Sequence, residues 1–324
     1  MTVGQKVEVA LALLLVALVA LIAVTSLFVP LRAAIALWLG AVIFFSATAL
    51  FLPIRAAELD PKPDPAPDAA AAEARLADRD AQTKVALNPL CHTILMPGAA
   101  ESADPKTRKV VVLIHGISTC PHAFVELAPR LANRGHVVFA PRMPQNGHAD
   151  RSTPALGDLT AEALTEYADA AVDVACGWAS ELGREIVVCG ISAGGTVAAW
   201  IGQNRPEVSR VVLVAPFFGL PGLGPRFNLF LTRFLLFVPN VSVWKNPWKR
   251  ERYGGHAHVY KRQSTRGTAE VMRLGYAVFA DAKTVAPAAR SVALVSNAHD
   301  RAISNIIPER LVRRWARHGA RVLR

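Results

Sequence analysis

The chain has 324 residues, of which 52% are hydrophobic, and 36 Lys and Arg against 25 Asp and Glu residues give it a formal net charge of +11. An apolar content this high is unusual for one soluble domain and indicates an apolar segment in addition to a core. The basic charge comes without a helix-turn-helix, zinc-finger or aromatic-basic sheet motif, which argues against a nucleic-acid partner.

The apolar excess is concentrated at the start of the chain. Residues 10–29 and 33–54 form two uncharged runs of twenty and twenty-two residues. Each is as long as the roughly 20 residues that a helix needs to cross a bilayer. We therefore predict a transmembrane helical hairpin over residues 1–54, with helices at about 10–29 and 33–54. A cleavable signal peptide is the alternative for the first run, but no small-x-small cleavage site follows it.

A hairpin would place its N-terminus and the following domain in one compartment. Lys6 and Arg55 flank its outer ends, whereas Arg32 lies in its turn. Under the positive-inside rule this balance favours a multi-pass protein of the bacterial inner membrane with its C-terminal domain in the cytoplasm. Four cysteines follow: Cys91, Cys120, Cys176 and Cys189. Their spacing matches no metal-binding or redox motif, which agrees with a reducing compartment.

Residues 55–84 are rich in Pro, Ala and Asp, and proline occupies alternate positions from Pro61 to Pro67. Prolines in this pattern enforce extended backbone and remove hydrogen-bond donors. We predict a semi-rigid spacer here, with a short helix over residues 69–80.

Residues 85–324 alternate apolar, β-branched runs with longer helix-forming segments. Strands are expected at residues 109–114, 136–140, 185–190, 210–215 and 291–296. Helices are expected near residues 121–134, 160–182 and 307–318, and from residue 193 onward. This order predicts an α/β domain with a doubly wound, mostly parallel sheet.

The most informative motif is Gly190-Ile191-Ser192-Ala193-Gly194, which joins a β-branched run to a stretch of small residues. A serine hydroxyl is a weak nucleophile, so it must be exposed on a sharp strand-to-helix turn, near a base and backbone N–H donors. Glycines on both sides let the strand and helix backbones approach each other. A chance match in a Gly- and Ala-rich chain is the alternative, but the strand and helix context favours a nucleophile elbow.

Two further loops fit this interpretation. The first expected strand ends in His115-Gly116-Ile117-Ser118, where a Gly-containing loop can turn a backbone N–H inward. In acyl-transfer enzymes one oxyanion donor comes from this loop and the other from the residue after the nucleophile, here Ile117 and Ala193. Asp300 follows the last expected strand, where the acid of a Ser, Asp, His order belongs; by itself it would be interpreted as a turn residue.

With these residues the chain resembles the α/β-hydrolase family, in particular bacterial carboxylesterases and the lysophospholipase or serine-aminopeptidase-like group. The resemblance runs from Val110 to the C-terminus and rests on His115-Gly116, residues 141–148, 190–195 and 211–217, and Asp300. It implies that Ser192 is the nucleophile, Asp300 the triad acid, and Ile117 with Ala193 the oxyanion donors. It also implies a cap over the active site, formed by residues 218–290.

The triad base has no candidate at its usual place. In this family it is a histidine after the last strand, and that strand can only be residues 319–324, where the sequence stops. Each of the nine preceding histidines has another expected role. We therefore predict that the base is absent, either because the chain is a truncated product or because the base was lost.

The expected cap contains an almost wholly apolar run, residues 227–238, followed by Trp244 and Trp248 among basic residues. A helix packed on the core is the simpler interpretation, and an interfacial lid that contacts lipid is the alternative. Both predict an apolar pocket for an acyl chain.

These features predict a membrane-anchored serine hydrolase that cleaves a carboxylic ester, of a lipid or another acyl compound, through an acyl-Ser192 intermediate. The alternative is a catalytically silent, membrane-tethered protein that holds an acyl ligand. A peptidase, thioesterase or acyltransferase would use the same elbow. The sequence contains no Gly-rich phosphate loop and no metal-ligand cluster, so no cofactor and no metal are expected.

Overall fold

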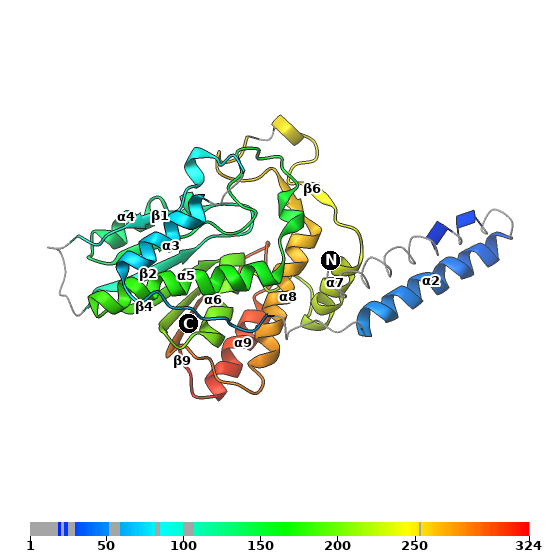
Figure 1. The fold of residues 1–324 in the computed structure, drawn as a ribbon. Helices are drawn as coiled ribbons and strands as arrows, with labels where there is room; N and C mark the ends of the chain where they lie inside the picture. The colour runs from blue at the N-terminus through cyan, green and yellow to red at the C-terminus, as the bar shows by residue number, and fades with distance from the viewer. Residues whose placement is uncertain are drawn as a thin grey trace.

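The computed structural model of the protein describes residues 19–20, 23–24, 30–51, 59–81, 85–99, 107–252 and 254–323. A seven-stranded sheet with helices on both faces forms the body of the domain (Figure 1). In spatial order its strands are β1 (Ile94–Met96), β3 (Val137–Ala140), β2 (Lys109–Ile114), β4 (Glu185–Ile191), β5 (Val208–Val214), β8 (Ser291–Val295) and β9 (Arg321–Leu323). A small second sheet consists of β6 (Ser242–Trp244) and β7 (Arg262–Ser264). The helices are α2 (Leu31–Phe51), α3 (Ala69–Ala81), α4 (Leu127–Ala132), α5 (Ala161–Leu182), α6 (Ala193–Asn204), α7 (Pro225–Phe237), α8 (Thr265–Asp281) and α9 (Ile306–Arg317).

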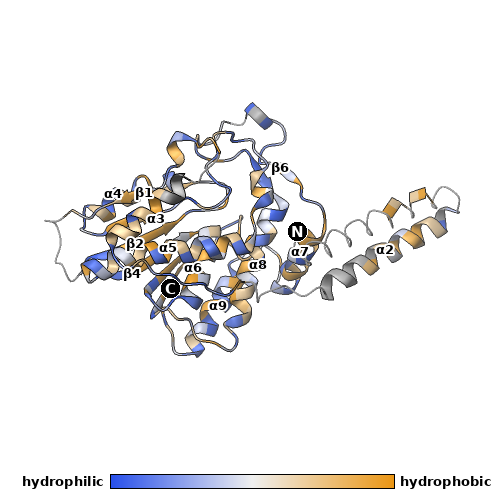
Figure 2. Ribbon diagram, viewed as in Figure 1, coloured by the Kyte–Doolittle hydropathy of each residue, from blue (hydrophilic) through white to orange (hydrophobic). Residues whose placement is uncertain are grey.

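The large sheet confirms the expected doubly wound, mostly parallel architecture. All neighbouring strands are parallel except β1 and β3. Helices cover both faces of such a sheet, so its strands are apolar on both sides. In β2 every residue from Val110 to Ile114 is buried, and in Figure 2 the strands at the centre of the sheet are predominantly orange.

The ends of α5 agree with the local signals in the sequence. The Thr160 side chain accepts a hydrogen bond from the N–H of Ala163 and so caps the N-terminus of the helix. Gly183 ends the helix in the left-handed conformation, with φ of 59°, which glycine adopts without steric cost. The expected helix over residues 160–182 is therefore confirmed.

The helix expected over residues 121–134 is interrupted. A 3-10 helix, η4 (Pro121–Phe124), comes first, and α4 begins only at Leu127. Pro129 explains the break, because it has no N–H to donate to the carbonyl of Val125 in a continuous helix. In the observed arrangement Pro129 lies in the first turn of α4, where no donor is needed.

The segment expected to be a spacer lies along the domain instead. Leu59 is buried, and its carbonyl accepts a hydrogen bond from Nε1 of Trp200. The backbone N–H groups of Lys62 and Asp64 donate to carboxylates on α5 at 2.7 and 3.1 Å. The short helix expected to follow is present as α3, and it packs against α5. Residues 59–81 are thus bound to the domain, because their few remaining N–H groups find acceptors on α5.

Residues 218–290, expected to form the cap, divide into two parts. The helix α7 and the β6–β7 sheet lie apart from the main sheet, whereas α8 packs against α5 and α6. Gly275 permits this packing, since a Cβ at that position would lie 2.8 Å from the ring of Phe218. The helix α8 therefore belongs to the helical layer, and only about residues 218–264 form a separate region.

The helix α2 covers most of the second apolar run, and it extends away from the body of the domain, with contacts to α7 (Figure 1). Its apolar side chains Ile35, Leu39, Ile43 and Phe44 are exposed. The first predicted membrane helix, residues 10–29, lies outside the described residues apart from 19–20 and 23–24. Within the part of the chain that the structure describes, no helix combines the length and apolarity needed to cross a membrane.

Candidate active site

Ser192 lies at the tip of the turn between β4 and α6, and its side chain is partly exposed. Its backbone has φ of 56° and ψ of −121°, a conformation that residues other than glycine rarely adopt. Two hydrogen bonds hold it there. The Ser192 N–H donates to the carbonyl of Val214 at 3.0 Å, and the Ser192 carbonyl accepts from the N–H of Phe217 at 3.0 Å. A strained residue that its surroundings hold in place is typical of a functional site.

The glycines around Ser192 are required by close backbone contacts. A Cβ at Gly190 would collide with the carbonyl oxygen of Gly194, and a Cβ at Gly194 would collide with the carbonyl oxygen of Ile114 on β2. A Cβ at Gly195 would lie 2.8 Å from Pro216. These contacts give a physical reason for the glycine pattern that the sequence motif showed.

The loop over residues 115–120, called the 115–120 loop below, lies against the elbow. A Cβ at Gly116 would be 3.5 Å from the Cβ of Ser192. Ala193 is the first residue of α6, so its N–H has no intrahelical acceptor. Among the described residues, neither the N–H of Ile117 nor that of Ala193 donates a backbone hydrogen bond. The two amides expected to bind an oxyanion are thus not engaged by other backbone groups.

His115 is a structural residue at the start of this loop. It is fully buried, its Nε2 accepts a hydrogen bond from the N–H of Met143 at 3.0 Å, and its Nδ1 lies 2.8 Å from the carbonyl oxygen of Gly116. The proton is therefore assigned to Nδ1. Burial lowers the pKa of His115 from 6.5 to about 4, against the opposing effect of the hydrogen bond to Gly116. A neutral imidazole with both nitrogens engaged cannot serve as the base for Ser192.

His115 should make the unfolding free energy depend on pH. The unfolded chain binds a proton below pH 6.5, whereas the folded chain binds it only near pH 4, so stability falls as the pH drops through this window. The loss attributable to this group is about 3 kcal/mol. Urea unfolding across the window should show a shallower pH dependence for His115→Gln than for the parent chain. Equal slopes for His115→Gln and the parent chain would contradict the assignment.

Asp300 lies in the turn after β8, at the same sheet edge as Ser192, because the carboxyl ends of parallel strands meet at one edge. Its Oδ1 accepts from the N–H groups of Ala302 at 2.7 Å and Ile303 at 3.3 Å. All nine histidines fall within the described residues, and none of them hydrogen-bonds to Ser192 or Asp300. Asp300 is thus placed at the expected edge, but no histidine of this part of the chain joins it to Ser192.

Several residues that the sequence did not single out hold the 115–120 loop. The buried Asn146 donates from Nδ2 to the carbonyls of Ile117 and Thr119, the latter at 2.9 Å. From the cap, the N–H of Tyr260 donates to the carbonyl of Ser118 at 2.9 Å. In the sequence, these contacts were indicated only by the family resemblance over residues 141–148, which include Asn146. The contact from Tyr260 crosses 142 positions of the chain and leaves no local pattern.

A disulfide joins Cys91 to Cys120 at the end of the same loop. Twenty-nine positions separate the two residues, and spacing alone does not identify such a pair. The cysteine spacing, interpreted above only as lacking a metal or redox motif, thus gave no sign of this pair, whereas Cys176 and Cys189 are free. Burial raises the pKa of both free thiols to about 11, which makes them poor nucleophiles.

The described residues contain no cluster of His, Cys, Asp or Glu that could hold a metal ion. A cavity of about 390 Å³ lies between the segment before α3, α3 itself and α5, with Lys62, Asp64 and Glu166 among its lining residues. Ser192 does not line this cavity. The acyl pocket expected near the elbow therefore stays a prediction.

Comparisons with known proteins agree with this arrangement. Residues 105–322 match the model of the family described as serine aminopeptidase, S33. A thermostable monoacylglycerol lipase of Bacillus sp. (strain H-257) is 26% identical over 168 residues, which cover 51% of this chain and 60% of that protein. The chain thus spans less than two thirds of the length of this curated relative.

Two solved structures share the fold. The monoacylglycerol lipase of Paleococcus ferrophilus superposes with a TM-score of 0.51 at 19% identity, over 72% of this chain and 87% of that one. A soluble variant of monoglyceride lipase from Saccharomyces cerevisiae gives a TM-score of 0.55 at 16% identity, over 71% and 80%. Together with the parallel sheet, the elbow at Ser192 and the family match over most of its length, these likenesses show that the chain belongs to the serine aminopeptidase, S33, family of α/β-hydrolases.

Proposed function

We propose that the protein is a serine hydrolase that cleaves a carboxylic ester through an acyl-Ser192 intermediate. The observation that carries this proposal is the strained Ser192 turn with two unused backbone N–H groups beside it. Ser192 Oγ attacks the ester carbonyl carbon, and the N–H groups of Ile117 and Ala193 stabilise the negative charge that develops on the carbonyl oxygen. The alcohol leaves with a proton, and water then releases the acid from Ser192.

A base must remove the proton from Ser192 Oγ, and in this proposal Asp300 orients a histidine in that role. Because all nine histidines of the sequence lie within the described residues, that histidine would have to be one that does not hydrogen-bond to Asp300 in this structure, or a residue beyond this sequence. If no such residue joins the site, the same fold serves a second candidate function, a silent protein that binds an acyl ligand. The observation favouring this second function is that no described histidine contacts Ser192 or Asp300.

The substrate class we propose is a lipid ester with a single acyl chain. Support comes from the relatives, because the Bacillus protein and the two superposed structures are monoacylglycerol or monoglyceride lipases. Attachment to a membrane through residues 1–54 suits such a substrate, and the exposed apolar side chains of α2 beside α7 support it. A fractionation experiment tests attachment: the chain should stay with membranes after an alkaline carbonate wash, and recovery in the soluble fraction would contradict it.

The catalytic proposal is tested with the full-length chain and a series of p-nitrophenyl esters with acetyl, octanoyl and dodecanoyl groups, together with a fluorophosphonate probe. A hydrolase should be labelled at Ser192 and should prefer one acyl length. A silent binder should retain a fluorescent fatty acid but show no labelling. Equal turnover of all three esters would contradict the acyl pocket. Labelling at another serine would contradict the role of Ser192 as nucleophile.

A further inference from the structure

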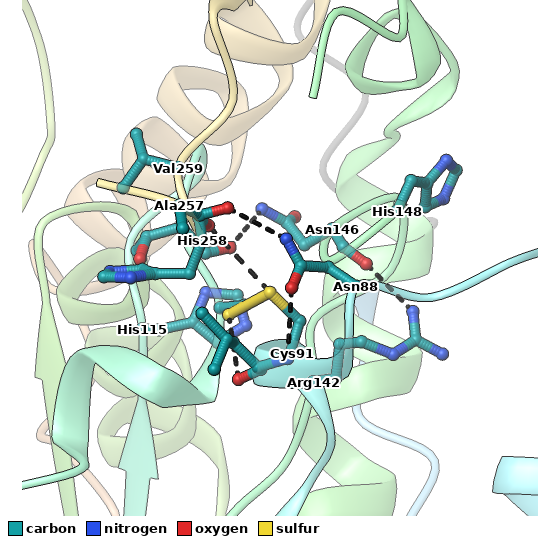
Figure 3. Close-up of a disulfide and its surroundings, with 12 residues drawn as sticks. Asn88, Cys91, His115, Arg142, Asn146, His148, Ala257, His258 and Val259 are labelled. Atoms are coloured by element: carbon teal, nitrogen blue, oxygen red, sulfur yellow. Dashed lines mark hydrogen bonds between the residues drawn. A yellow bond between two sulfur atoms is a disulfide. The ribbon is translucent and has the colours of Figure 1, made fainter. Parts of the chain in front are cut away.

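The Cys91–Cys120 disulfide lies in the interior of the domain, beside the candidate active site. Cys91 is 1% exposed and Cys120 is fully buried, and their Cα atoms are 5.3 Å apart, within the usual range for a disulfide. Cys120 directly follows Thr119, so the covalent bond is attached to the end of the 115–120 loop. The two sulfur atoms are bonded to each other (Figure 3).

The other half of the disulfide belongs to a segment that is itself held from two sides. Asn88, three positions before Cys91, donates from its backbone N–H to the carbonyl of Gly147 at 2.9 Å. Its side chain donates from Nδ2 to the carbonyl of Ala257 in the cap at 2.9 Å (Figure 3). The disulfide therefore connects the 115–120 loop to a segment that contacts both the loop after β3 and the cap.

The remaining contacts of the 115–120 loop are hydrogen bonds. Asn146 binds the carbonyls of Ile117 and Thr119, and Tyr260 binds that of Ser118. Lys245 donates from Nζ to Oγ of Ser118 at 2.6 Å. These bonds hold the middle of the loop, whereas its C-terminal end is followed directly by the short 3-10 helix η4. The disulfide is the only covalent restraint on that end in the described part of the chain.

We propose that the Cys91–Cys120 disulfide positions the 115–120 loop beside Ser192, and that the domain is therefore made for an oxidising compartment outside the cytoplasm. Its formation removes two protons and two electrons from the thiols, which pass to the disulfide of a thiol–disulfide oxidoreductase and convert it to a dithiol. Buried structural disulfides form and persist in the periplasm or outside the cell and are rare in the cytosol. This placement is opposite to the cytoplasmic side that the flanking charges favour. The role of the loop in catalysis rests on the proposed function, whereas the disulfide and the compartment do not.

Thiol trapping in the native cell tests the compartment without reference to activity. Cells are quenched in acid, and the denatured full-length chain is treated with a maleimide–polyethylene glycol reagent before and after reduction. The chain has four cysteines, of which two are free in the structure. We expect two additions before reduction and four after it. Four additions before reduction would overturn the proposal. In the control variant Cys91→Ser we expect three additions in both samples.

Hydrogen exchange on the purified chain tests the positioning role. After reduction, we expect the amides of residues 116–120 to exchange about tenfold faster or more, while those of β4 and α6 around Ser192 keep their protection. The double variant Cys176→Ser/Cys189→Ser, which keeps the disulfide, should show the same response to reduction. No change in the 115–120 loop, or a uniform increase over the whole domain, would overturn the positioning role. If the fluorophosphonate probe does not label Ser192 in the oxidised chain, that result contradicts the proposed function but not the role of the disulfide.

Discussion

Ser192→Ala is expected to abolish both labelling by a fluorophosphonate and the hydrolysis of esters. The substitution removes the hydroxyl that we propose forms the acyl intermediate, and loss of the nucleophile in a complete triad lowers turnover on the order of a millionfold. What remains is the contribution of oxyanion donors and substrate binding. The measurement is the initial rate with a p-nitrophenyl ester, together with mass spectrometry of the labelled peptide that contains the elbow.

The companion variant Ser192→Gly separates chemistry from strain. It also lacks the nucleophile, but glycine tolerates the positive φ of 56° at this position. We expect Ser192→Gly to be equally inactive and about 1 kcal/mol more stable toward unfolding than Ser192→Ala. The exposed Ser180→Ala is the control that should leave labelling intact. Hydrolysis at the parent rate in Ser192→Ala would show that another residue carries the reaction.

Arg205→Leu is expected to destabilise the fold by about 3–5 kcal/mol. The Arg205 side chain is 1% exposed and forms ion pairs with Asp169 and Asp173 at 2.6 Å and with Glu207 at 3.1 Å. Burial acts to lower the pKa of Arg205, but the hydrogen bonds to Glu207 and Asp173 outweigh it and raise the pKa, so the guanidinium stays charged. Leucine would leave two buried carboxylates without their cation.

Equilibrium unfolding in guanidinium chloride measures this effect. Arg290→Leu is the matched control, because Arg290 is 68% exposed and pairs with Glu185 on the surface at 2.8 Å. A surface pair contributes about 0–1 kcal/mol, so this control should change little. Adding Asp173→Asn to Arg205→Leu should restore part of the lost stability, since it removes one unpaired buried charge. A loss no larger than that of Arg290→Leu would show that the carboxylates find other partners.

The Arg205 network also explains how the N-terminal segment is attached. The same two aspartates that bind Arg205 accept the backbone N–H groups of Lys62 and Asp64. Arg205→Leu should therefore loosen residues 59–81 as well as the domain. The proline pattern predicts only that residues 61–67 are extended. They are fixed to the domain because the buried carboxylates of Asp169 and Asp173 can accept these backbone N–H groups in addition to binding Arg205.

Features that depend on neighbours along the chain could be predicted from the sequence. The strands β2, β4 and β8 follow from short apolar runs, the ends of α5 from Thr160 and Gly183, and the elbow from glycines around Ser192. The sequence also indicated that Ser192 and Asp300 lie at the same edge of the sheet, because each follows the carboxyl end of a parallel strand.

Contacts between residues far apart in the sequence could not be predicted and became visible in the folded domain. Cys91 is bonded to Cys120, and Asn146 and Tyr260 hydrogen-bond to the 115–120 loop. Carboxylates of α5 form ion pairs with Arg205. The folded domain also showed that His115 is a neutral structural residue, since burial and a bond from Met143 set its state. Such contacts join residues far apart in the chain, and their geometry follows from how strands and helices pack, so no local spacing in the sequence encodes them.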